Sequence, residues 1–146
     1  MEFSVKLFDE LSTSDLYEVL QLRSAVFVVE QQCAYQDVDG KDQKALHVLG
    51  KLNGTLRAYA RCFGPNQYFQ EAAIGRIIIH SDSRGQGCGH VLVEKAISVI
   101  EDYYQTSHIT ISAQQHLHDM YYKHGFRQIG ESYLEDDIPH IKMIRK

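Results

Sequence analysis

A glycine-rich turn between an apolar run and an amphipathic stretch constrains the fold of this chain more than any other feature. The run Ile77–Ile79 has the β-branched side chains typical of a strand, and glycines occupy positions 85, 87 and 89 before a stretch with helical periodicity. Glycines let the backbone turn sharply and approach a ligand closely, while the start of a helix presents free amide groups. With Arg84 at the head of the turn, the segment predicts an anion site whose layout suits a pyrophosphate.

Two common nucleotide-binding motifs do not fit this turn. A P-loop requires Gly-x-x-x-x-Gly-Lys followed by Ser or Thr, and the turn has neither the lysine nor the hydroxyl that would hold Mg²⁺. A dinucleotide fingerprint requires Gly-x-Gly-x-x-Gly and an acidic residue about 20 residues later, whereas Asp102 comes too early and within the following helix. The pattern Arg84-x-x-Gly87-x-Gly89 therefore needs a different explanation.

This pattern resembles the acetyl-CoA pyrophosphate loop of the GNAT N-acetyltransferase superfamily. The segment Tyr121–Phe126 is similar to the Tyr-x-x-x-Gly-Phe sequence that occurs later in the same family. Two further segments, Leu22–Tyr35 and Glu135–Met143, resemble the ElaA-like branch of the superfamily. Because the agreement occurs at separated places from about Leu22 to Met143, it covers nearly the whole chain and is more specific than any one motif.

The resemblance implies which residues bind acetyl-CoA and which assist the reaction. The backbone of the strand before the turn would pair with the pantetheine arm, and Gln114 stands where the family often has an asparagine that contacts the same arm. Tyr121 holds the position of the tyrosine that gives a proton to the departing CoA thiolate. The expected cofactor-binding residues are Ile77, Ile78, Ile79, Arg84, Gly85, Gln86, Gly87, Cys88, Gly89 and Gln114.

A general base is also needed, because an alkyl amine is protonated near neutral pH and must lose a proton before it attacks a thioester. Glu30, Asp39, His80 and His140 are the candidates that their residue types allow. Glu30 closes the helix that the family uses as a wall of the acceptor site, and His80 leaves the strand toward the thioester end. We therefore expect Glu30 and His80 to act with Tyr121 as the catalytic residues.

The charge distribution favours an amine acceptor over nucleic acid. The chain has 15 basic and 19 acidic side chains, a formal charge of −4, and no basic stripe of the kind that binds nucleic acid. Acidic residues gather at Asp37, Asp39 and Asp42 and again at Asp136-Asp137, where they either attract a cationic amine or form a solvated acidic face. The predicted acceptor is an amine-bearing small molecule or a protein amine, and we expect it to bind as a cation on the side that the Glu30–Asp42 and Glu135–His140 segments form.

No metal cofactor is expected. The eight histidines include His116-x-His118, but residues two apart on a helix point about 200° apart and cannot chelate one ion. Three cysteines without a Cys-x-x-Cys pair indicate reduced thiols. The first residues lack the basic and apolar regions of a secretory signal, and no apolar run is long enough for a membrane helix, so we expect a cytoplasmic protein without membrane contact. The sequence leaves a homodimer open.

Hydrophobic periodicity predicts one α/β (α+β) domain that spans residues 1–146. Asn53-Gly54 between two alternating runs predicts a tight hairpin, and the helix His90–Tyr104, with an apolar face at positions 92, 93, 96, 97, 100 and 103, leads to a strand that begins at His108. This order predicts one parallel crossover, and a helical stretch Gln114–His124 precedes two final antiparallel strands. The expected architecture is a GNAT-type mixed, mostly antiparallel six- to seven-stranded sheet with helices on both faces.

The leading hypothesis is an acetyl-CoA-dependent N-acetyltransferase in which the amine attacks the thioester directly. A CoA-binding regulatory or interaction domain with the same fold and no catalysis is the alternative. Tyr121 favours the enzyme, because a protein that only binds CoA does not need a proton donor.

Overall fold

The chain folds into a seven-stranded mixed sheet with helices on both faces. The computed structural model describes all 146 residues, and the strands lie in the order β1-β2-β3-β4-β5-β7-β6. Every neighbouring pair of strands is antiparallel except β4 and β5, which are parallel. The expected fold class is therefore confirmed. The strands are β1 (Glu2–Leu7), β2 (Leu46–Leu52), β3 (Thr55–Phe63), β4 (Ala72–Ile79), β5 (Ile109–Gln114), β6 (Phe126–Glu135) and β7 (Ile138–Arg145).

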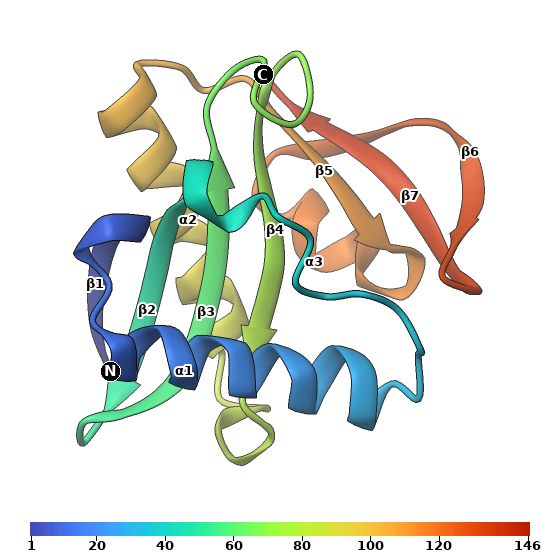
Figure 1. Cartoon of the computed structure of the whole chain (residues 1–146). Helices are drawn as coiled ribbons and strands as arrows, with labels where there is room; N and C mark the ends of the chain where they lie inside the picture. Colours follow the sequence, from blue (N-terminus) through green and yellow to red (C-terminus); the bar gives the residue numbers. More distant parts are fainter.

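Two long helices lie on opposite faces of the sheet. The helix α1 (Thr13–Arg23) crosses the face that is toward the viewer in Figure 1, and it continues as a π-helical segment (Ser24–Glu30). The helix α2 (Cys88–Tyr104) lies behind the sheet in the same view. The segment 31–45 returns from the end of α1 across the front of β4 to β2, so the region between β4 and β5 is covered on the α1 side.

The core beneath α2 follows the predicted apolar face with two exceptions, because Val99 is buried although the periodicity did not assign it to the core, and Tyr103 is exposed. The buried residues of this helix are Leu92, Val93, Ala96, Ile97, Val99 and Ile100. Tyr103, which the periodicity also assigned to the core, is 56% exposed. Tyr104 packs inward instead, because Gly64 leaves room for it: a Cβ on Gly64 would lie 2.5 Å from the Tyr104 ring. The end of α2 therefore packs through Tyr104 rather than Tyr103.

The predicted helical stretch Gln114–His124 is shorter than the sequence indicated. The strand β5 extends through Gln114, because this residue pairs with His140 of β7. A 3₁₀ turn (Gln115–Leu117) follows, and only α3 (His118–Tyr122) is α-helical. The hairpin at Asn53-Gly54 is confirmed, and its residues have φ of +51° and +80°, as a type I′ turn requires.

The strands β4 and β5 separate soon after they pair. Their parallel ladder consists of Ala72 opposite Ile109 and Ala73 opposite Thr110, and beyond Ala73 the β5 side of β4 has no partner strand. The register of β4 against β3 also shifts between Gly75 and Ile78, where Arg76 has a φ of +51°. This bulge and the separation open a gap through the sheet, and the functional residues gather around it.

Two negative observations complete the description. No helix combines the length and apolar character that are needed to cross a bilayer. No three histidine, cysteine, aspartate or glutamate side chains come together in an arrangement that could ligate a metal ion.

Candidate active site

The glycine turn lies where β4 ends and α2 begins, as the sequence predicted. Gly85 and Gly87 have φ of +78° and +79°, which glycine adopts without strain, and Cys88 is the first helical residue. No side chain caps this end of α2, so the amide groups of its first turn are available to a ligand. The turn borders a cavity of about 420 Å³, and it combines flexible backbone, free amides and the positive end of a helix dipole.

This 420 Å³ cavity, called the turn cavity below, brings together most of the predicted site residues. The predicted residues that line it are Glu30, Ile77, Ile78, Ile79, Arg84, Gly85, Gly87, Cys88, Gly89, Gln114 and Tyr121. Gln86 is exposed and does not line the cavity. His80 does not line it either, because its Nδ1 accepts a hydrogen bond from the amide of Asp82 at 3.1 Å and lies 3.0 Å from Arg57. The structure therefore does not bring His80 to Tyr121.

Glu30 and Arg84 form an ion pair at the turn cavity. The Nη1 atom of Arg84 lies 2.7 Å from the Oε2 atom of Glu30, and its Nε donates to the carbonyl of Ile79 at 2.9 Å. Both charged groups are partly exposed. In this arrangement, without a bound ligand, Glu30 neutralises the cation of the anion site.

The cavity is bounded on its far side by the end of β5 and by Gln31, the residue after the π-helical segment. Gln114 of β5 donates from Nε2 to the Oε1 atom of Gln31 at 3.3 Å, which joins the two segments across the gap beside β4. The open edge of β4 at residues 77–79 lines the same space. An extended ligand arm can therefore lie along this edge as an additional strand would.

Tyr121 occupies the inner end of the turn cavity. Only 5% of this residue is exposed, and its ring packs edge-on against Phe126 with the ring centroids 6.0 Å apart. Its hydroxyl makes no hydrogen bond with the rest of the chain, and burial raises its pKa well above the ordinary value for tyrosine. The phenol is thus protonated at neutral pH and free to donate. Tyr122, by contrast, lies outside the cavity beneath the guanidinium of Arg127.

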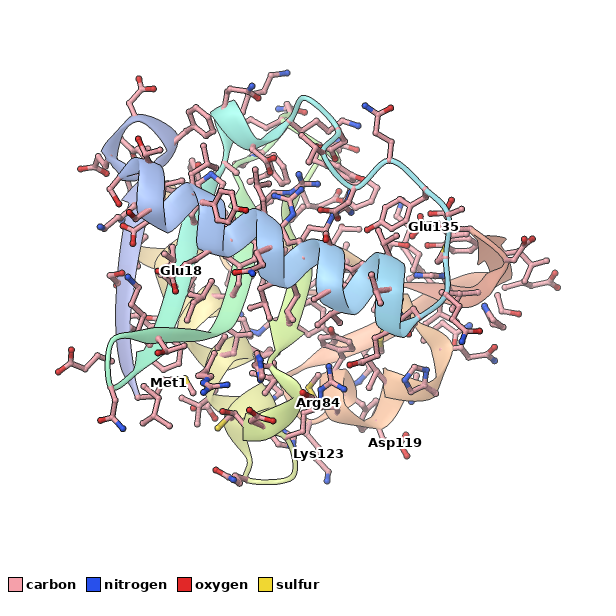
Figure 2. The ribbon with its side chains drawn as sticks, turned by 60° about the horizontal axis from the view of Figure 1, so that its bottom comes forward. Met1, Glu18, Arg84, Asp119, Lys123 and Glu135 are labelled. Carbon is pink, nitrogen blue, oxygen red and sulfur yellow. The ribbon has the colours of Figure 1, made fainter.

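A second cavity of about 130 Å³ lies on the other side of Tyr121, and we call it the junction cavity. It shares six lining residues with the turn cavity, which are Phe27, Gln31, Ile77, Gln114, Leu117 and Tyr121. Arg84 and Glu135, which line the two cavities separately, lie on either side of the C-terminal end of the long helix in Figure 2. A ligand in the turn cavity and a second ligand in the junction cavity would therefore meet at Tyr121.

The junction cavity contains a polar cluster from the Glu135–His140 segment, which the sequence assigned to the acceptor side without predicting its contacts. The Oε2 atom of Glu135 lies 3.3 Å from Nε2 of His140, and the hydroxyl of Ser112 contacts both Glu135 and the hydroxyl of Tyr133. His140 donates from Nδ1 to the carbonyl of Ile138 at 2.7 Å, since a carbonyl can only accept. The signal for this cluster was Asp136-Asp137, whose φ values of +51° and +63° form the tight turn that folds β7 back onto β6.

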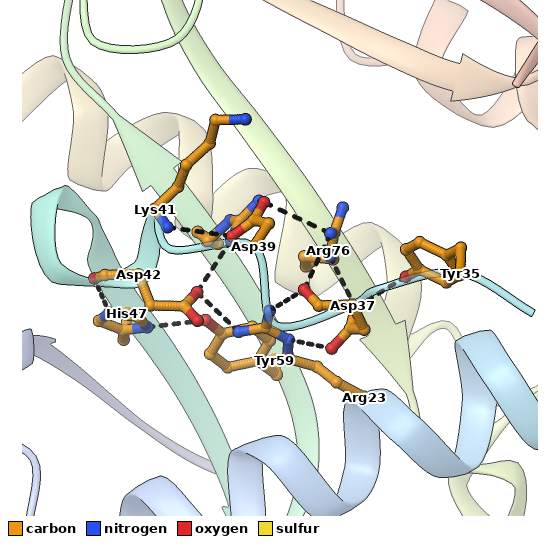
Figure 3. A network of polar contacts seen from close by, with 10 residues as sticks. Arg23, Tyr35, Asp37, Asp39, Lys41, Asp42, His47, Tyr59 and Arg76 are labelled. Carbon is orange, nitrogen blue, oxygen red and sulfur yellow. Dashed lines mark hydrogen bonds and ion pairs between the residues drawn. The ribbon is translucent and has the colours of Figure 1, made fainter. Parts of the chain in front are cut away.

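The acidic group at Asp37, Asp39 and Asp42 is not an acceptor site, and this expectation is wrong. Figure 3 shows Arg23 and Arg76 beside these carboxylates. Arg61 binds Asp39 and Asp42 as well, so all three carboxylates are bound by arginines. Burial alone would raise the pKa of Asp39, but hydrogen bonds from Arg61 hold this pKa well below its ordinary value. Their negative charge is already compensated inside the protein, so it cannot attract an ammonium. The network instead holds segment 31–45 against the sheet.

Comparisons with known proteins show the family of this chain. The family of acetyltransferase (GNAT) domains matches residues 14–146. Protein ElaA of Escherichia coli K12 is 42% identical over 139 residues, which cover 94% of this chain and 91% of the relative. A UPF0039 protein of Schizosaccharomyces pombe is 39% identical over 145 residues, which cover 98% of this chain and 95% of the relative.

Solved structures of related proteins have the same fold as this chain. An acyl-CoA N-acyltransferase from Pseudomonas aeruginosa superposes with a TM-score of 0.94 at 40% identity, with both chains fully covered. The crystal structure of Escherichia coli ElaA superposes with a TM-score of 0.93 at 40% identity, with 99% of each chain covered. The family match, the sequence identity over nearly the full length and the shared fold all point to one family. The chain belongs to the GNAT acetyltransferase family, with ElaA among its relatives.

Proposed function

We propose that this protein transfers an acetyl group from acetyl-CoA to a primary amine. The observation that carries the proposal is the turn cavity, in which one space joins the glycine turn, the open edge of β4 and the hydroxyl of Tyr121. Membership of the GNAT family and 40% identity to a Pseudomonas aeruginosa acyl-CoA N-acyltransferase support it.

The turn cavity suits each part of acetyl-CoA. The pyrophosphate would accept hydrogen bonds from the amides of residues 85–89 at the start of α2, where the helix dipole favours an anion. Arg84 would exchange Glu30 for a phosphate, which is a stronger partner because it offers more negative charge and several acceptor oxygens. The pantetheine arm would pair with the open edge of β4 and bring the thioester to Tyr121.

The chemistry then requires one bond to form and one to break. The nitrogen of the neutral amine attacks the carbonyl carbon of the thioester and forms the C–N bond, and the C–S bond breaks. A free amide group of the β4 edge can stabilise the negative charge that develops on the carbonyl oxygen. Tyr121 donates a hydrogen bond to the departing sulfur and gives up its proton as the charge on that sulfur grows.

Thiol release tests this function directly. We expect the purified protein to release CoA from acetyl-CoA only when a primary amine is present, as measured with a thiol reagent, and to form the acetylated amine, as measured by mass spectrometry. CoA binding without amine-dependent thiol release would instead identify the chain as a non-catalytic CoA-binding domain.

A further inference from the structure

A third cavity extends from the junction cavity away from the turn cavity. It has a volume of about 350 Å³, within the range of small-molecule sites, and we call it the aromatic cavity. It shares five lining residues with the junction cavity, which are Ile74, Gly75, Arg76, Ser112 and Glu135. The three cavities thus form a series from the glycine turn through Tyr121 to Glu135. A molecule in the aromatic cavity can extend one end toward Tyr121.

Four of the twelve residues that line the aromatic cavity are aromatic. The rings of Phe63 and Tyr68 have centroids 5.1 Å apart, and Tyr68 meets Phe69 edge-on at 4.9 Å. Tyr133 of β6 also lines the space. Such walls favour an apolar or aromatic group over a hydrated chain, because burial of apolar surface and ring contacts are both favourable.

The charges around this cavity limit the charge of its ligand. Arg76 is already bound by Asp37 and Asp39, but Lys142 forms no ion pair and its Nζ lies 5.2 Å from the centre of the Phe69 ring. A second positive charge on a ligand would therefore be repelled by Lys142. Glu135 is half exposed where the aromatic and junction cavities meet, and it offers the carboxylate that can hold a single ammonium.

Glu135 is also placed to take a proton. Because His140 donates from Nδ1 to Ile138, its Nε2 atom is the one that faces Glu135, at 3.3 Å. A proton received by Glu135 can therefore be shared with His140. The charged and titratable groups that line the two cavities with Glu135 are His140 and Lys142 of β7, Tyr133 of β6, Arg76 of β4, Arg61 of β3, which is already paired with Asp39 and Asp42, Tyr68 at the aromatic cavity, and Asp136, Cys33, Tyr35 and Tyr121 at the junction cavity.

We propose that the acceptor is a primary amine with one positive charge and an apolar or aromatic group, and that Glu135 is its general base. This rests on the proposed acetyl transfer. The apolar group occupies the aromatic cavity, the ammonium binds Glu135, and the nitrogen points through the junction cavity to the thioester beside Tyr121. His140 acts through Glu135 and is a positioning residue.

The proton balance is complete. Glu135 takes one proton from the ammonium, and the freed lone pair forms the C–N bond. The CoA sulfur takes the proton of Tyr121 as the C–S bond breaks. The second proton of the nitrogen leaves as the amide forms and restores Tyr121, and Glu135 then returns its proton to solvent, so one proton is released per turnover.

The first test is Glu135→Gln with 2-phenylethylamine as the acceptor. We expect kcat/KM at pH 7 to fall at least ~100-fold, while the Kd for CoA from calorimetry is unchanged. The deficit should shrink as the pH approaches the amine's own pKa, because the amine then arrives neutral; a structural defect would not respond in this way. Glu131→Gln, at an exposed position of the same strand, is the matched control and should stay within about twofold of wild type.

Two further variants test the roles of the neighbours. His140→Gln should lower kcat at least ~10-fold with little change in the KM for the amine, because it disturbs proton transfer and leaves the aromatic cavity intact. Wild type should use 2-phenylethylamine at least ~10-fold better than spermidine, which carries several charges. Lys142→Glu should raise kcat/KM for spermidine.

The outcomes separate this inference from the proposed function. Wild-type turnover with 2-phenylethylamine that is unaffected by Glu135→Gln, or a preference for spermidine, would overturn the inference and leave acetyl transfer standing. A wild-type protein that binds CoA and acetylates neither amine would also overturn the inference, whereas the proposed function would be overturned only if no primary amine caused thiol release.

Discussion

Removal of Arg23 should destabilise the protein far more than removal of a surface cation. This side chain is fully buried and donates from Nε to Asp37 at 2.8 Å, from Nη1 to Asp42 at 2.7 Å and from Nη2 to the carbonyl of Asp37 at 2.8 Å. Arg23→Met keeps the apolar stem and removes all three contacts. Two buried carboxylates and one carbonyl then lose a partner.

The loss of unfolding free energy in Arg23→Met depends on the arginine partners that Asp37 and Asp42 keep. Loss of one member of a buried ion pair costs about 3–5 kcal/mol. Asp37 keeps Arg76 and Asp42 keeps Arg61, each at 2.8 Å, so we expect the lower end of this range, about 3 kcal/mol. Urea unfolding followed by circular dichroism measures the change in the free energy of unfolding.

Lys6→Met is the matched control. Lys6 is 34% exposed and lies 2.8 Å from Asp15, which keeps Lys51 as its second cation. A partly exposed pair of this kind contributes about 0–1 kcal/mol, so this variant should be close to wild type.

Arg23→Met should also raise the KM for the amine and leave the Kd for CoA unchanged, because the network holds the segment that lines the junction cavity and not the glycine turn. A loss below about 1 kcal/mol for Arg23→Met, equal to that of Lys6→Met, would refute the reasoning, since the network would then contribute no more than a surface pair.

Three other predictions address the site and the response to acid. Gly87→Val should weaken CoA binding at least ~10-fold in calorimetry, because a β-branched residue is strained at φ +79° and its side chain enters the anion site; unchanged affinity would place the pyrophosphate elsewhere. Tyr121→Phe should lower kcat ~100-fold or more with an unchanged Kd for CoA, whereas Tyr122→Phe should have a mild effect; full turnover of Tyr121→Phe would reduce Tyr121 to a packing residue. Burial alone would raise the pKa values of Asp39 and Asp42 in the folded protein, but contacts with arginines lower them below the ordinary carboxylate value. The ionised carboxylates therefore stabilise the folded state above the ordinary carboxylate pKa, and this contribution is lost as the pH falls below about 4 toward the lower folded-state pKa values. Urea midpoints from pH 6 to pH 3 should therefore decrease most steeply below pH 4, and a flat profile would contradict this.

The features that could be predicted from the sequence depend on neighbours along the chain. The hairpin at Asn53-Gly54 follows from the positive φ that these two residues tolerate, and the buried face of α2 follows from helical periodicity. The periodicity failed where packing chose between adjacent residues, since Gly64 accommodates Tyr104 and leaves Tyr103 in solvent. The length of α3 was also wrong, because pairing across β5 and β7 outweighed the helical pattern after Gln114.

The sequence by itself determined the anion turn, since Arg84 and the three glycines lie within the six residues 84–89 and need no distant partner to form it. Only the tertiary structure decided the roles of the acidic residues. Asp37, Asp39 and Asp42 are bound by three arginines from α1, β3 and β4, and Glu135 is brought to His140 by the turn between β6 and β7. The residue type alone does not show whether a carboxylate is buried beside an arginine or open to an amine, because strand register and burial set its charge partners.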